Sequence, residues 1–239
     1  MRLAAFRFWL RLAAIIVTLA GAVPLHLLWR LFRLPSPWPR LYLGGLGWIV
    51  GARKQVIGRP LKRNVVFIAN HLSWMDIPIL AGATGTAFVA KADLRDVPLV
   101  GWLSTLNRTI FVRREDRLGI ADQIALLRGA LAEAWAVTLF PEGTTSDGTT
   151  ILPFKASLLA VLDPPPAGVL VQPVRIDYGD ATAELAWVGD EHGKEHATRV
   201  LRRPGHFTVH LTFCDPFDPA AYDGRKAIAA EARRRIEVI

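Results

Sequence analysis

The pattern of apolar and polar positions changes near residue 50. Leu12–Trp29 is a stretch of 18 residues without a charged side chain, and Leu41–Val50 is a second apolar stretch. Pro35–Pro39 lies between them and predicts a turn that ends the first helix. From Asn64 onward, short β-branched runs alternate with stretches of helical periodicity. The pattern therefore predicts a helical N-terminal segment followed by an α/β domain.

Within the α/β part, apolar runs bounded by turn residues predict strands, and a 3.6-residue period predicts helices. The expected strands are 64–69, 86–90, 109–112, 136–140, 169–176, 183–188 and 207–213. The expected helices are 99–106, 118–134 and 225–237. Alternating strands and helices indicate an α/β fold with a mixed, largely parallel sheet flanked by helices.

The N-terminal stretch is borderline for a membrane span. As a helix, Leu12–Trp29 is about 27 Å long, against a hydrocarbon core of about 30 Å. Arginines flank it on both sides, and the positive-inside rule then keeps both ends in the cytoplasm. We expect residues 1–55 to be a two-helix membrane-associating element and residues 56–239 to be the catalytic domain. A signal peptide cleaved near Ala20–Ala22 is the competing interpretation.

Charge supports a membrane surface as partner. The chain of 239 residues has a net charge of +8. Its first 75 residues include 11 Lys and Arg and no Asp or Glu, so the positive charge is concentrated there. Trp9, Trp29, Trp38 and Trp48 lie in the same segment, as interfacial tryptophans do. Nucleic acid is not the expected partner, because the basic residues flank apolar runs. The single cysteine, Cys214, excludes an intrachain disulfide and favours a reducing compartment.

Candidate chemistry follows the predicted strand 64–69, at Asn70–Asp76. His71 can accept a proton at neutral pH, and Asp76 can orient its ring and stabilise the imidazolium. Five residues on a helix rotate by about 140°, so the two side chains meet only if a turn separates them. The competing interpretation is that Ser73 or Asp76 caps a helix and that His71 is structural.

Two other strand ends offer groups for a substrate. The loop at Phe140–Thr144 brings a glutamate, glycine amides and hydroxyls suited to a phosphate or glycerol oxygen. Ile110–Arg114 ends in two arginines, whose planar guanidinium groups match a phosphate dianion. Lys91 is a second cationic candidate, with a surface lysine as the simpler interpretation.

With Val171–Val174, these motifs resemble the glycerolipid acyltransferase family, which includes 1-acyl-sn-glycerol-3-phosphate acyltransferases. The resemblance implies transfer of a fatty acyl chain from acyl-CoA or acyl carrier protein to lysophosphatidate, giving phosphatidic acid, with no metal or other cofactor. It implies catalysis by His71 and Asp76 on the cytoplasmic face of the cell membrane. Candidates for contact with the lysophospholipid are Arg114, Glu142, Gly143, Thr144, Ser73 and Lys91.

Two departures from the family leave the acceptor open. The family often has an acidic residue at Arg113, and many relatives have arginine at Thr145, so a lyso-ornithine lipid or another lysophospholipid is an alternative acceptor. A non-catalytic lipid-binding protein and a periplasmic hydrolase are further alternatives. His192–His196 matches an inverted zinc-peptidase pattern, but Gly193 disfavours a helix there. No Gly-x-Ser-x-Gly elbow of a serine hydrolase occurs.

Overall fold

A computed structural model of the chain describes all residues except 1, 98–99, 113–124, 126–127 and 130–135. Arg113 and Arg114 therefore lie outside the described residues. So does most of the helix predicted over 118–134.

The centre of the fold is a seven-stranded sheet with the order β1-β7-β6-β2-β5-β3-β4. The strands are β1 Ala52–Ile57, β2 Val65–Ala69, β3 Ala87–Lys91, β4 Ile110–Val112, β5 Ala136–Leu139, β6 Leu170–Asp177 and β7 Phe207–Phe213. Strands β2 to β6 run parallel to one another, while β7 is antiparallel to β6 and parallel to β1. The predicted mixed, largely parallel sheet is confirmed.

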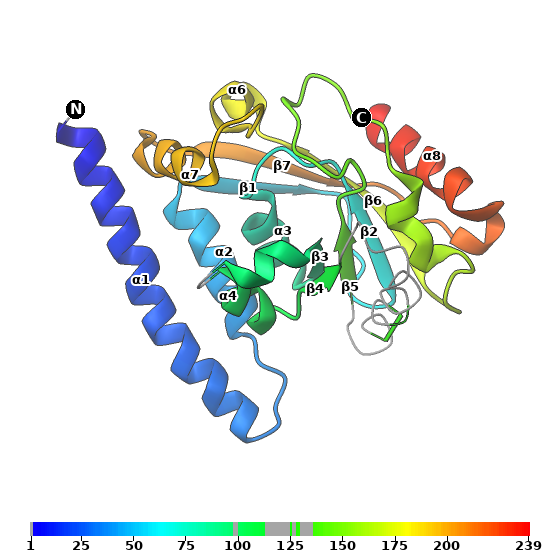
Figure 1. Cartoon of the computed structure of the whole chain (residues 1–239), viewed down its shortest axis with the longest axis horizontal. Coiled ribbons are helices and arrows are strands. Elements are labelled where there is room, and N and C mark those ends of the chain that lie inside the picture. Colours follow the sequence, from blue (N-terminus) through cyan, green and yellow to red (C-terminus); the bar gives the residue numbers. More distant parts are fainter. Residues whose placement is uncertain (1, 98–99, 113–124, 126–127, 130–135) are drawn as a thin grey trace.

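Helices cover both faces of this sheet. They are α1 Arg2–Leu31, α2 Trp38–Ile49, α3 Asp76–Thr84, α4 Val100–Leu106, α6 Thr182–Leu185, α7 Gly193–Arg202 and α8 Gly224–Glu237. Alternate residues of β2 point to opposite faces. Val65 and Phe67 join a core with α3 and α7, whereas Val66 and Ile68 join a second core with α8. Figure 1 shows α8 and α1 at opposite sides of the molecule.

The two N-terminal helices pack against the catalytic domain rather than standing apart from it. Helix α2 crosses α3 where Gly44 faces Gly82, so closely that a Cβ atom on Gly82 would lie 2.4 Å from Gly44 Cα. Near the start of α1, the Arg11 guanidinium donates to the carbonyls of Val200, Leu201, Arg203 and Gly205 at the end of α7, at 2.9–3.2 Å. These contacts fix both helices on one side of the domain (Figure 1).

Two local expectations were wrong, and one strand was not predicted. Strand β1 was not predicted, because it is an edge strand in which only Ala52 is buried. The strand expected over 183–188 is instead helix α6 followed by an extended segment. A short alternation of apolar and polar residues does not distinguish a strand from a helix, and Ala, Glu and Leu favour the helix. Helix α7 does form, and it begins at Gly193, because a glycine at the first helical position costs little.

Candidate active site

The site lies at the edge of the sheet where parallel strands end. The segment from Asn70 to Asp76 follows β2, Phe140 and Glu142 follow β5, and Tyr178 follows β6. Because β5 and β6 both pair in parallel with β2, these three segments meet at one edge. Open α/β sheets bind their ligands at such carboxyl ends.

The Asp76 carboxylate organises the turn between β2 and α3. Its Oδ2 accepts hydrogen bonds from His71 Nδ1 at 2.7 Å and from the backbone N–H groups of Leu72 and Ser73 at 2.7 and 3.0 Å. Asp76 is fully buried at the first residue of α3, where the helix dipole favours a negative charge. The predicted contact between His71 and Asp76, through an intervening turn, is confirmed.

The His71 ring is held in one orientation and is still accessible. It stacks on Phe140 with ring centroids 4.1 Å apart, and its side chain is 18% exposed. A carboxylate oxygen can only accept, so Nδ1 carries a proton and the neutral ring leaves Nε2 as the basic nitrogen. Among the described residues, none makes a hydrogen bond to Nε2. The ring is therefore prepared to take a proton from a bound group.

Glu142 lies behind His71 and not on the open surface. It is 1% exposed, and its Oε1 accepts from the His71 backbone N–H at 3.3 Å. Burial raises the pKa of the Glu142 carboxyl to about 7, and the negative charge of Asp76 adds to this effect. Glu142 therefore supports the backbone of the histidine, and its direct contact with the acceptor stays a prediction.

The loop after Glu142 is tied to the same turn. Ser146 N–H donates to the His71 carbonyl at 2.8 Å, and Gly143 has a φ of 73°, a conformation that favours glycine. Thr144 is exposed beside them, while Thr145 donates its hydroxyl proton to the Trp187 carbonyl. Of the two predicted loop residues, Thr144 is therefore exposed, whereas Gly143 is partly buried and its N–H donates to the Phe140 carbonyl at 3.1 Å.

The remaining candidates from sequence are placed differently. Ser73 is fully buried, and its hydroxyl oxygen accepts from Met75 N–H at 3.4 Å, so it belongs to the turn rather than to an accessible surface. Lys91 is the last residue of β3, on the same edge of the sheet as the turn. Arg114 lies outside the described residues.

Two residues of the site have roles that the sequence did not indicate. The Tyr178 hydroxyl donates to Asp76 Oδ1. Asn70 bridges β2 to β6, because its side chain donates to the Ile176 carbonyl at 2.9 Å and accepts from the Ile176 N–H at 2.7 Å. The only signal was position: Tyr178 follows the predicted strand 169–176 by two residues.

His196, from the pattern that resembles a zinc peptidase, is a buried core residue. Its ring stacks on Trp187, and its Nε2 donates to the Leu185 carbonyl at 3.0 Å. In the part of the chain that the structure describes, no group of three or more His, Cys, Asp and Glu residues gathers as metal ligands do.

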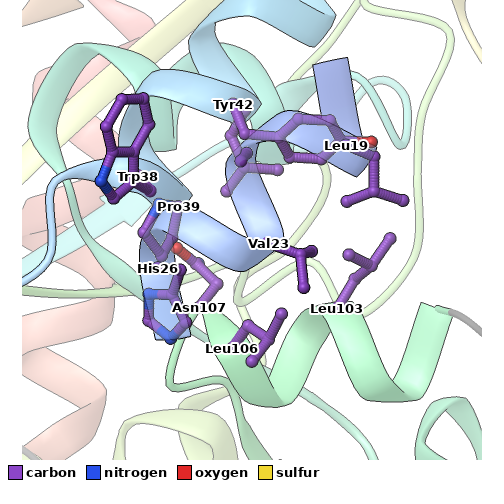
Figure 2. Close-up of a pocket in the computed structure, with 11 residues that line it drawn as sticks. Leu19, Val23, His26, Trp38, Pro39, Tyr42, Leu103, Leu106 and Asn107 are labelled. Atoms are coloured by element: carbon purple, nitrogen blue, oxygen red, sulfur yellow. The ribbon is translucent and has the colours of Figure 1, made fainter. Parts of the chain in front are cut away.

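A small cavity of about 30 Å³ lies between α1, α2 and α4. Figure 2 shows Leu19 and Val23 of α1, Tyr42 of α2 and Leu103 of α4 around it. It shares no residue with the turn at His71. Its lining is mostly apolar and comes from the N-terminal helices α1 and α2 and from α4 of the catalytic domain.

Comparison with known proteins agrees with this geometry. The family model described as Acyltransferase matches residues 53–177. A lyso-ornithine lipid O-acyltransferase of Rhodobacter capsulatus is 32% identical over 94% of this chain and 86% of its own length. A 1-acyl-sn-glycerol-3-phosphate acyltransferase of Neisseria gonorrhoeae is 33% identical over 54% of this chain and 51% of its own length.

Among solved structures, the fold is similar to that of the 1-acyl-sn-glycerophosphate acyltransferase of Thermotoga maritima. The two share a TM-score of 0.68 at 24% identity, and the match covers 99% of this chain and 94% of that one. Since the family model spans more than half of the chain and the Rhodobacter relative nearly all of it, this chain belongs to the Acyltransferase family and is an acyltransferase.

Proposed function

We propose that this chain transfers a fatty acyl group from an acyl thioester to the free hydroxyl of a lyso-lipid, with His71 as the general base. One observation carries this proposal: Asp76 holds Nδ1 of His71 at 2.7 Å, while Nε2 is unpaired among the described residues on an accessible ring. That arrangement is the one required of a base that removes a proton from a hydroxyl group.

The reaction proceeds in two steps with His71 as proton carrier. Nε2 takes the hydroxyl proton as the acceptor oxygen attacks the thioester carbonyl, forming a C–O bond and a tetrahedral intermediate. The intermediate then expels the thiolate, which takes the proton back from the imidazolium, leaving an ester and a free thiol. Asp76 stabilises the imidazolium between these steps, and Glu142 and Ser146 hold the His71 backbone.

The donor is acyl-CoA or acyl-acyl carrier protein, used as a co-substrate, and the mechanism needs no other cofactor. Gly143, whose N–H donates to the Phe140 carbonyl at 3.1 Å, and Thr144, which is exposed, lie on the loop that is hydrogen-bonded to the His71 turn through Ser146. They are our candidates for holding the acceptor near Nε2, together with Arg114 and Lys91 as cations.

For the acceptor we place lyso-ornithine lipid first and lysophosphatidate second. The relative that aligns with 94% of this chain is a lyso-ornithine lipid O-acyltransferase, whereas the lysophosphatidate relative aligns with 54%. Many members of the family have an arginine at the position of Thr145, and here the threonine hydroxyl is bonded to the Trp187 carbonyl. A site without that cation suits an amino-acid headgroup better than a phosphate dianion.

The N-terminal helices provide the contact with the membrane. Helix α1 is long and apolar enough to cross a bilayer, none of its residues is buried, and Phe6, Trp9 and Ile16 are among its exposed apolar side chains. Arg11 nevertheless ties its first turns to α7, and α2 returns to pack on α3. Because both ends of the hairpin are held by the catalytic domain, insertion into one leaflet fits better than a crossing.

We therefore propose that the catalytic domain lies on the cytoplasmic face of the cell membrane, where acyl-CoA and acyl carrier protein are found. Cysteine accessibility at the N-terminus and near Arg53 tests this placement. Labelling of both positions from the cytoplasm supports it. A periplasmic N-terminus, or a mature chain that begins near Val23, would contradict it.

The assay for the activity is acyl transfer by the purified membrane protein. Lyso-ornithine lipid, lysophosphatidate and other lysophospholipids are each supplied with acyl-CoA and with acyl-acyl carrier protein. We expect the highest kcat/KM with lyso-ornithine lipid. A preference for lysophosphatidate would overturn the choice of acceptor, and binding without transfer to any acceptor would overturn the proposed activity.

A further inference from the structure

Tyr178 is one of three tyrosines in the chain and is buried completely at the end of β6. Its ring packs edge-on against Phe207 at 5.7 Å between centroids. Its hydroxyl, the one polar group of the side chain, donates to Asp76 Oδ1. A buried tyrosine hydroxyl needs such a partner, and here the partner is the carboxylate that holds His71.

The two oxygens of Asp76 have different surroundings. Oδ2 accepts from the His71 ring and from two backbone N–H groups. Within the described part of the chain, Oδ1 accepts only from Tyr178. The carboxylate plane is therefore defined at one end by the turn and at the other end by the tyrosine.

The position of the tyrosine relative to the turn is itself fixed. Two residues before it, both backbone groups of Ile176 are hydrogen-bonded to the side chain of Asn70, the residue before His71. Burial, together with the negative charge of Asp76, raises the pKa of the Tyr178 hydroxyl well above its ordinary value. The hydroxyl therefore remains a proton donor at neutral pH.

We propose that Tyr178 is a positioning residue, which locks Asp76 and through it sets the orientation of the His71 ring toward the acceptor hydroxyl. This inference rests on the proposed role of His71 as general base. Tyr178 does not touch the reacting atoms: it acts through Asp76. Besides Tyr178, the titratable groups facing Asp76 in the described structure are the His71 ring and the Glu142 carboxyl, and neither reaches Oδ1.

The test is Tyr178→Phe, which removes the hydroxyl and keeps the ring that packs on Phe207. Loss of a hydrogen bond to a charged group corresponds to a decrease in kcat of about 10-fold, with KM for the acceptor within about twofold because substrate contacts are kept. Tyr222→Phe is the matched control, since Tyr222 packs on Phe217 in the other core. We expect it to retain wild-type kcat.

A double-mutant cycle with Asp76→Asn separates positioning from general packing. If the tyrosine acts through Asp76, the double variant keeps kcat within about twofold of Asp76→Asn alone. The inference would be overturned if Tyr178→Phe lowered kcat by the same factor in the wild-type and Asp76→Asn backgrounds. It would also be overturned if Tyr178→Phe alone had the wild-type kcat. His71→Ala is measured alongside: if that variant is active, the proposed base fails, and if it is inactive while Tyr178→Phe is normal, only this inference fails.

Discussion

Replacing Glu142 with glutamine should remove a loss of stability that the wild-type protein suffers as pH rises. The Glu142 carboxyl is 1% exposed, and burial raises its pKa from 4.5 to about 7. Oε2 is buried without a hydrogen-bond partner in the described structure, while Oε1 accepts from the His71 N–H. The folded protein therefore favours the neutral carboxyl, and a glutamine amide resembles that neutral form.

The magnitude follows from proton linkage. A carboxyl whose pKa is higher in the folded than in the unfolded state contributes its full stability below pH 4.5, and that contribution is lost as pH rises to about 7. A difference of about 2.5 pH units amounts to about 3 kcal/mol in the free energy of unfolding. For a chain of this size that corresponds to about 6–12 °C in Tm.

The assay is thermal unfolding of the detergent-solubilised protein between pH 5 and pH 8. We expect Tm of Glu142→Gln to rise relative to wild type across this range, with most of the gain in place by pH 7. Glu195→Gln, at an exposed position of α7, is the control and should follow the wild-type curve. Parallel Tm curves for Glu142→Gln and wild type would refute the reasoning about the buried carboxyl.

Three further predictions concern the helices and the acceptor. Gly82→Ala would place a Cβ atom 2.4 Å from Gly44 Cα and should lower the free energy of unfolding by about 1–3 kcal/mol. Gly45→Ala, where a Cβ atom would have nothing within 4 Å, should not destabilise the protein. Chemical unfolding of both variants checks this prediction. Arg11→Met removes the guanidinium contacts with the end of α7 and should free α1, which faster amide exchange in residues 2–11 would reveal. If lysophosphatidate is the acceptor, Arg114→Ala should raise the KM for it by about 10- to 150-fold, because a charge-assisted hydrogen bond is lost. An unchanged KM would show that Arg114 binds no phosphate monoester.

The strongest sequence patterns predicted their elements well. The buried strands β2 and β7 and the surface helix α8 agree with their predicted ranges to within one residue at each end. Strand β1 gave no such signal, because an exposed edge strand needs no apolar pattern. Segment 183–188 gave a misleading one, since its alternation arises in a short helix and an extended stretch that packs on the core.

In the site, the predictable contacts were the local ones. The contact of His71 with Asp76 was expected on the condition that a turn separates the two residues, and one turn does connect them. The contact of Asp76 with Tyr178 spans 102 positions and exists only because β6 pairs with β2. Burial of Glu142 was hidden for a similar reason: a loop sequence does not reveal which side chain turns inward.

The central claim, that His71 is the base of an acyl transfer to a lyso-lipid, is tested most directly by single-turnover acyl transfer with wild type and His71→Ala. Both proteins are loaded with the acyl donor and mixed with the preferred lyso-lipid. General-base catalysis predicts a rate constant about 10²–10⁴ lower in the variant, at similar acceptor affinity. A rate constant within a factor of about two of wild type would contradict the account.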